Sequence, residues 1–122
     1  MVVCPQYVHI DQDTEIAVCH PEGDLDARTS AAFREAAAQL CGRSRVVFDL
    51  SGLVFMDSCG LGALIGGIRR IREHGGTVVV CSGRRPISRL LRTVGLDRVV
   101  TVEDSFELAV RQLGGSGSTA RC

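Results

Sequence analysis

The stretch Phe55-Met56-Asp57-Ser58-Cys59-Gly60-Leu61-Gly62 decides how this chain folds, because it marks the change from strand to helix. The apolar run at residues 45–50, a few positions earlier, contains β-branched residues and is too short for a helix, as is typical of a buried strand. From residue 61 to residue 71, apolar residues recur at the spacing of one helix face. The stretch therefore predicts a short loop and a helix that begins at Ser58, with an acid, a hydroxyl and a thiol side by side.

Strand and helix patterns alternate along the rest of the chain. Turn-forming residues at 11–13 separate two strand-like runs and predict an N-terminal hairpin. The expected strands are residues 3–10, 14–20, 45–50, 77–81 and 99–102, and the expected helices are residues 29–40, 58–74, 86–94 and 105–113. This order, β-β-α-β-α-β-α-β-α, predicts an α/β fold in which helices pack against a mixed β-sheet with the hairpin at its edge.

Length and charge limit the classes of protein that this chain can belong to. We expect one domain over residues 1–113 and a flexible Gly/Ser-rich tail at residues 114–122. The formal net charge is zero, which argues against general attraction to nucleic acid or anionic membranes. Residues 1–62 nevertheless hold four Arg and nine acidic residues, whereas residues 63–122 hold ten Arg and five acidic residues. This asymmetry could orient a partner, or it could reflect only solvated helix faces. The absence of Lys excludes Schiff-base chemistry and a P-loop lysine.

The six cysteines are spread along the chain, with no two closer than 15 residues. Because there is no Cys-x-x-Cys pair, the sequence supports neither a zinc site nor a dithiol redox pair, and we expect no metal and no cofactor. It contains no signal-peptide pattern and no apolar run near the ~20 residues of a membrane span, so we expect a cytoplasmic protein with reduced thiols. Cys19 and Cys81 lie in apolar runs and are expected to be core residues.

The residues at the start of the helix at 58–74 allow several functions. Asp57 or Ser58 could be an ordinary N-cap, worth about 1 kcal/mol. The same helix terminus would also stabilise a phosphate, since its N–H groups and dipole favour negative charge. Cys59 could be a nucleophile with a lowered pKa, but no histidine lies near it in sequence. Gly60 and Gly62 would leave room for another molecule to approach the backbone.

The central stretch, with Ala63-Leu64-Ile65 after it, closely resembles the signature of bacterial anti-sigma factor antagonists, the STAS-domain family. Four further segments are similar to motifs of that family: Gly23-Asp24-Leu25-Asp26, Val46-Val47-Phe48-Asp49-Leu50-Ser51, Gly75-Gly76-Thr77-Val78-Val79-Val80 and Leu90-Leu91-Arg92-Thr93-Val94-Gly95-Leu96. The resemblance covers about residues 5–113 and implies a STAS fold.

The resemblance implies that the chain is a switch without enzymatic activity. Ser58 would be the residue phosphorylated by an anti-sigma factor with Ser kinase activity, and a Ser/Thr phosphatase would reverse the modification. The unphosphorylated form would bind the anti-sigma factor and release a sigma factor for transcription. The implied partner-binding residues are Asp24, Asp57, Ser58, Cys59, Gly60, Leu61 and Gly62. Cys59 stands where the family usually has Ser or Thr, and Asp24 where it more often has Glu.

Other readings remain open from the sequence. The chain could be a STAS scaffold or a subunit of a sensory complex that acts by protein–protein assembly. It could also be the soluble domain of an anion transporter or an enzyme that uses Cys59. Nucleic-acid binding would depend on Arg84, Arg85, Arg89 and Arg92. No aromatic residues interleave these arginines, which argues against that class.

Overall fold

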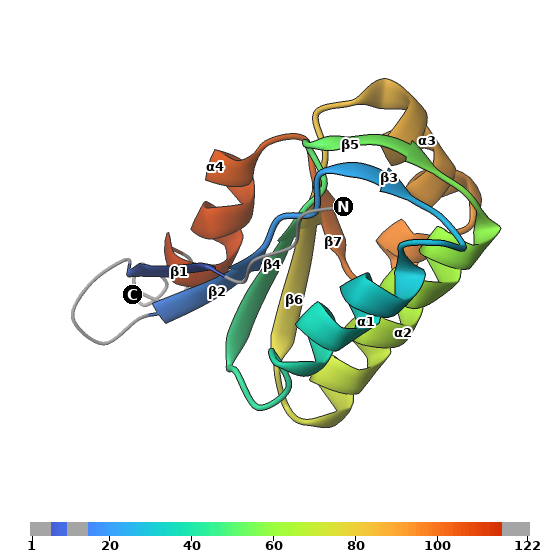
Figure 1. Cartoon of the computed structure of the whole chain (residues 1–122). Coiled ribbons are helices and arrows are strands. Elements are labelled where there is room, and N and C mark those ends of the chain that lie inside the picture. The colour runs from blue at the N-terminus through green and yellow to red at the C-terminus, as the bar shows by residue number, and fades with distance from the viewer. Residues whose placement is uncertain (1–5, 10–14, 116–122) are drawn as a thin grey trace.

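Five strands form the main sheet in the computed structural model, which describes residues 6–9 and 15–115 (Figure 1). In spatial order they are β1 (Gln6–His9), β2 (Glu15–Cys19), β4 (Arg45–Asp49), β6 (Thr77–Cys81) and β7 (Thr101–Glu103). β1 pairs with β2 in the antiparallel sense, and all the other neighbouring pairs of this sheet are parallel. The predicted α/β class, mixed sheet and edge hairpin are therefore confirmed. The predicted turn at residues 11–13 and the tail beyond residue 115 lie outside the described residues.

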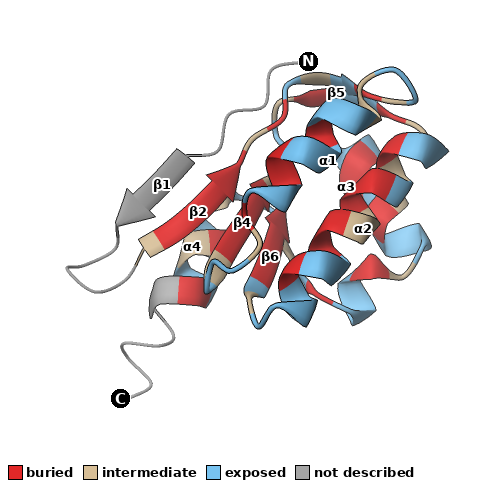
Figure 2. Ribbon diagram, turned by 60° about the horizontal axis from the view of Figure 1, so that its bottom comes forward, coloured by how far each residue is buried: buried red, intermediate tan, exposed pale blue. Residues whose placement is uncertain are grey.

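Helices cover both faces of the sheet (Figures 1 and 2). They are α1 (Ser30–Ala38), α2 (Ser58–Glu73), α3 (Arg85–Thr93) and α4 (Phe106–Val110). Alternate residues along the strands point to opposite faces, so Phe48 joins the core beneath α1, α2 and α3, while Val47 joins the core beneath α4. Strands buried on both faces in this way read as continuous apolar runs, which is why β4 and β6 were recognisable from sequence.

A short parallel ribbon made of β3 (Gly23–Leu25) and β5 (Leu53–Met56) was not predicted from the sequence. It lies beyond the carboxyl ends of the main strands, between α3 and the helix pair α1 and α2 (Figure 1). The register shifts within the ribbon: Gly23 is opposite Leu53, but Asp24 is opposite Phe55. One step along β3, from Gly23 to Asp24, therefore corresponds to two steps along β5, from Leu53 to Phe55. The extra residue, Val54, forms a β-bulge.

Two predicted boundaries near the C-terminus differ from the structure. The strand expected at residues 99–102 is β7 at Thr101–Glu103, preceded by a 3₁₀ turn at Leu96–Arg98. Gly95, at a φ of 82°, ends α3, and the tight turn after it buries Leu96 before the strand begins. α4 ends at Val110, and residues Arg111–Gly115 form a wider π-type turn. Leu113, the last residue of the expected helix, lies in that turn and is still buried.

Candidate functional site

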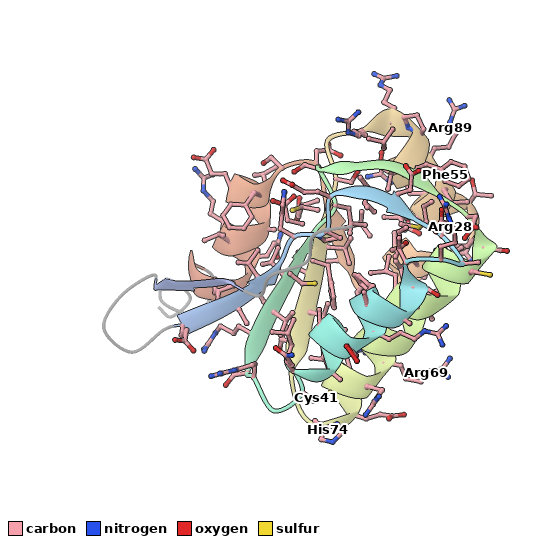
Figure 3. The ribbon with its side chains drawn as sticks, viewed as in Figure 1. Arg28, Cys41, Phe55, Arg69, His74 and Arg89 are labelled. Carbon is pink, nitrogen blue, oxygen red and sulfur yellow. The ribbon has the colours of Figure 1, made fainter. Side chains whose placement is uncertain are left out.

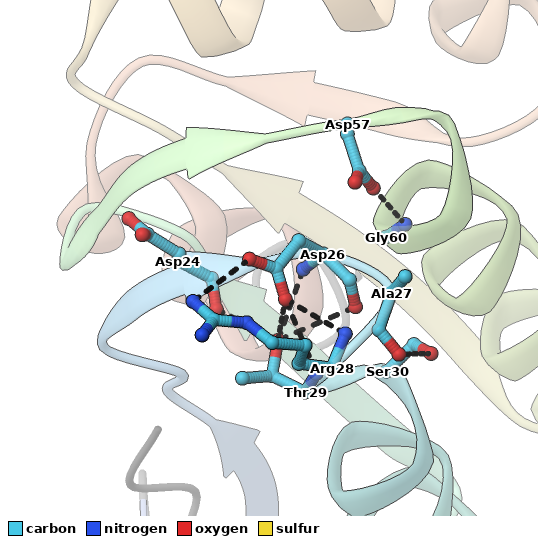
Figure 4. Close-up of polar contacts among 8 residues, drawn as sticks. All are labelled: Asp24, Asp26, Ala27, Arg28, Thr29, Ser30, Asp57 and Gly60. Atoms are coloured by element: carbon cyan, nitrogen blue, oxygen red, sulfur yellow. Dashed lines mark hydrogen bonds and ion pairs between the residues drawn. The ribbon is translucent and has the colours of Figure 1, made fainter.

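Ser58 is the first residue of α2 and is exposed to solvent. Its hydroxyl makes no hydrogen bond within the described part of the chain. Asp57 is the N-cap: its Oδ1 accepts a hydrogen bond from the Gly60 N–H at 2.9 Å, and its backbone oxygen accepts one from Leu61 N–H at 2.9 Å (Figure 4). Asp57 N–H in turn donates to the backbone oxygen of Leu25 at 3.2 Å. The cap therefore belongs to Asp57, and the Ser58 side chain is left available to a partner.

Gly60 lies where α2 packs against β3. It is buried, and a Cβ placed on it would come within 2.7 Å of the Leu25 carbonyl carbon and 2.8 Å of Leu25 Cγ. The glycine is needed so that α2 can approach β3, and its backbone is not open to another molecule. The structure therefore gives Gly60 a packing role within the chain, and its part in partner binding stays a prediction.

Gly62 differs from Gly60 in its surroundings. It is exposed, and a Cβ placed on it would meet nothing within 4 Å. Cys59 is also exposed, whereas Leu61 is half-buried and packs against the main core. Three residues in the stretch from Asp57 to Gly62 are therefore exposed at the start of α2. They are Ser58, Cys59 and Gly62.

Asp24 lies on β3, exposed, opposite Phe55 of β5. The side chain that caps the loop after β3 is that of Asp26. Asp26 Oδ1 accepts hydrogen bonds from the backbone N–H of Arg28 at 3.0 Å and of Thr29 at 3.2 Å, and Thr29 Oγ1 donates to the Asp24 backbone oxygen at 2.8 Å (Figure 4). The spacing of Asp26 and Thr29 is typical of such local turns and could have indicated this network from sequence.

The electrostatic state of Asp26 follows from these contacts. Burial raises the pKa of its carboxyl, but hydrogen bonds from the backbones of Arg28 and Thr29 and the Thr29 hydroxyl, with the nearby Arg28 guanidinium, lower it by more. The pKa of Asp26 therefore lies below its ordinary value. The anionic form of Asp26 thus fixes the loop that joins β3 to α1, directly below the start of α2.

Sequence reasoning missed an apolar feature beside this site. Val54 is 66% exposed and Phe55 is 50% exposed, on the strand that leads into Ser58 (Figure 3). The signal available in the sequence was the unbroken apolar run from Leu53 to Met56, which is longer than an alternating edge strand would carry. Val54 and Phe55 are thus two neighbouring exposed apolar side chains just before the start of α2.

Two of the cysteines are buried in the core of the described residues. Burial raises the pKa of the Cys19 thiol to about 12, and burial together with the Asp49 carboxylate raises the pKa of Cys81 to about 12. Both thiols are thus protonated core groups, as the sequence predicted. Within residues 6–9 and 15–115, no cluster of His, Cys, Asp and Glu is suited to a metal ion, and no helix has the length and apolar character of a membrane span.

Comparisons with known proteins agree with the fold. The sequence matches the STAS domain family over residues 7–109, and the chain belongs to this family. An anti-sigma F factor antagonist of Paenibacillus polymyxa is 30% identical to it over 109 residues, which are 87% of this chain and 93% of that protein. The family expected from the central stretch is therefore confirmed.

Two solved structures with the same fold are an anti-sigma factor antagonist and a Bacillus cell fate determinant. An anti-sigma factor antagonist from Mycobacterium paratuberculosis superposes with a TM-score of 0.75 at 22% identity, covering 92% of this chain and 94% of that chain. The Bacillus cell fate determinant SpoIIAA in its phosphorylated form superposes with a TM-score of 0.63 at 18% identity, covering 89% of this chain and 98% of that chain. At these identities the likeness establishes the fold.

Proposed function

We propose that this chain is an anti-sigma factor antagonist whose binding is switched by phosphorylation of Ser58. The observation that carries the proposal is an exposed serine, without a hydrogen-bond partner among the described residues, at the first position of a helix whose cap is supplied by its neighbour Asp57. Membership of the STAS family and the similarity to an anti-sigma F factor antagonist support it. The chain would act by binding alone, without catalysis of its own.

In the unmodified state, the surface that carries Ser58, Cys59 and Gly62 docks on the anti-sigma factor, which then releases its sigma factor. The anti-sigma factor is also a Ser kinase that holds ATP and Mg²⁺ and transfers phosphate to Ser58. A Ser/Thr phosphatase resets the switch. Gly62 carries no side chain, and a Cβ placed on it would meet nothing within 4 Å. The partner can therefore approach the backbone of this turn of α2 closely.

Phosphorylation would add about −1.5 to −2 charges at the surface of the complex. The exposed Asp24 on the adjoining ribbon would repel this charge, and so would Asp57 at the helix cap. Desolvating a phosphate dianion in an interface adds to the penalty. In the separate protein, the N-terminal N–H groups and dipole of α2 stabilise the phosphate. The modified protein should therefore leave its partner while staying folded.

The decisive experiment is mass spectrometry after incubation with the cognate anti-sigma factor, ATP and Mg²⁺. We expect phosphate on Ser58. Phosphate on Thr29 or Ser30 with none on Ser58 would show that the assignment is wrong. Ser30 is a suitable internal control, since its hydroxyl also lies near the start of a helix but donates to the Ala27 backbone oxygen at 3.4 Å.

Two substitutions separate modification from binding. Ser58→Ala should still bind the anti-sigma factor but accept no phosphate. Ser58→Asp should bind at least about tenfold more weakly, a difference of about 1.4 kcal/mol. Equal affinity of the two variants would contradict the electrostatic account of the switch.

A further inference from the structure

The two exposed apolar residues before Ser58, Val54 and Phe55, form a surface that we call the apolar ridge. In a regular strand, successive side chains alternate between faces, so one of two neighbours would be buried. Here the bulge leaves Val54 without a residue opposite it on β3, and both side chains turn to solvent while Leu53 and Met56 on either side are buried. The exposure of the ridge is thus imposed by the backbone register.

The ridge has an acidic flank on the β3 side. Asp24 is directly opposite Phe55 and is exposed. Asp26, one position beyond the end of β3, is held as an anion by the hydrogen bonds of its loop. The only cation bonded to this loop among the described residues is Arg28, at 3.9 Å from Asp26. Negative charge therefore borders the ridge on this side.

The opposite flank is basic. α3 packs against β5, and the Arg84 Nε donates to the backbone oxygen of Ser51 at 3.1 Å, which holds the start of α3 beside the turn that leads into β5. Arg85 and Arg89 are exposed on α3, and the helix contains no acidic residue (Figure 3). Exposed guanidinium groups therefore lie on the helix that packs against this side of β5.

We propose that the apolar ridge is the anchor by which the anti-sigma factor docks, in a cleft with basic groups facing β3 and acidic groups facing α3. This inference rests on the proposed function and adds the chemistry of the partner's surface. Opposite charges on the two flanks allow only one orientation of the partner across the ridge. In that orientation the partner covers Phe55 and Ser58 together, since only two residues separate them at the junction of β5 and α2.

Site-specific photocrosslinking in the native host tests which surface the partner covers. A benzophenone amino acid is placed in the full chain at position 55, at position 58 and, as a matched control, at Leu108. Leu108 is an exposed apolar residue on α4, across the sheet from the ridge (Figure 1). We expect the chains with the probe at 55 and at 58 to capture the same anti-sigma factor, identified by mass spectrometry, and the chain with the probe at 108 not to capture it.

Each other outcome identifies the part that fails. Capture of an anti-sigma factor from position 58 but not from 55, or equally from 55 and 108, overturns the ridge as the anchor and leaves the proposed function standing. Capture of one protein of another class from both 55 and 58 overturns the proposed function and the partner that we assign to the ridge. If neither position captures a protein, both proposals fail.

Affinity measurements with the purified anti-sigma factor test the anchor and its flanks. Phe55→Ser and Val54→Ser should each weaken binding about tenfold or more, whereas Leu108→Ser should change it less than about twofold. Asp24→Arg and Arg89→Glu should each slow association, and raising the salt concentration should reduce the difference from the unsubstituted chain. Unchanged affinity in Phe55→Ser and Val54→Ser, with unchanged thermal unfolding, would contradict the inference.

Discussion

Gly60→Ala should be strongly destabilising, although it places a good helix former in a helix. Gly60 sits in the first turn of α2, where that turn crosses β3. The added methyl group would meet the backbone carbonyl and the side chain of Leu25, with its nearest carbon neighbours at 2.7 and 2.8 Å. Because Leu25 is fully buried and its carbonyl belongs to the ribbon, the helix itself must move away.

The size of the effect follows from three terms. Overpacking costs about 1–3 kcal/mol, and contact with a fixed backbone group favours the upper value. Displacing the turn also weakens the hydrogen bond from Gly60 N–H to Asp57, and a lost cap costs about 1 kcal/mol. The higher helix propensity of Ala returns about 1 kcal/mol. The expected net loss is about 3 kcal/mol.

Urea unfolding followed by circular dichroism measures this loss, which should lower the midpoint by about 2 M for a domain of this size. Gly62→Ala is the matched control, since it lies two residues further along the same helix and its methyl group would meet nothing within 4 Å. That variant should gain about 0.5–1 kcal/mol. If Gly60→Ala were as stable as the unsubstituted chain, α2 could not approach β3 as described. Equal losses in both variants would mean that the contact with Leu25 is not the cause.

Further predictions concern the surroundings of Ser58 and the core. Because its carboxyl pKa is lowered on folding, Asp26 stabilises the fold above its unfolded pKa of about 3.9, and this contribution is lost as pH falls through the folded pKa. When the pH is lowered from neutral to acid, the free energy of unfolding of Asp26→Asn should therefore fall less than that of the unsubstituted chain. Urea unfolding at both pH values measures this difference. Asp57→Ala should cost about 1 kcal/mol of stability by the same method. A smaller loss in Asp57→Asn would identify the cap as the cause, because Asn is also a good N-cap residue. Iodoacetamide at neutral pH should label exposed Cys59 in the native state but label Cys19 and Cys81 only on unfolding, because both are buried and have a pKa of about 12. Native labelling of Cys81, read by mass spectrometry, would contradict its place in the core.

Much of the fold was predictable because its elements have strong local patterns. The strands β4 and β6 are buried on both faces and read as apolar runs, and α2 has a regular apolar stripe between Asp57 and the glycines that follow it. The ribbon was not predictable, since β3 is a three-residue strand and its partner β5 lies far away in sequence. Pairing of such short segments depends on tertiary contacts that no local pattern records.

The sequence by itself determined that Ser58 begins a helix after a strand, since strand length, helix spacing and capping are properties of neighbouring residues. Only the tertiary structure decided which side chains around Ser58 face a partner. Gly60 and Gly62 look alike in the sequence, yet Gly60 is packed on Leu25 and Gly62 is open to solvent. Val54 and Phe55 look like core residues, yet the bulge against β3 exposes both. These differences arise from the register and close approach of segments distant in sequence, which composition and spacing cannot encode.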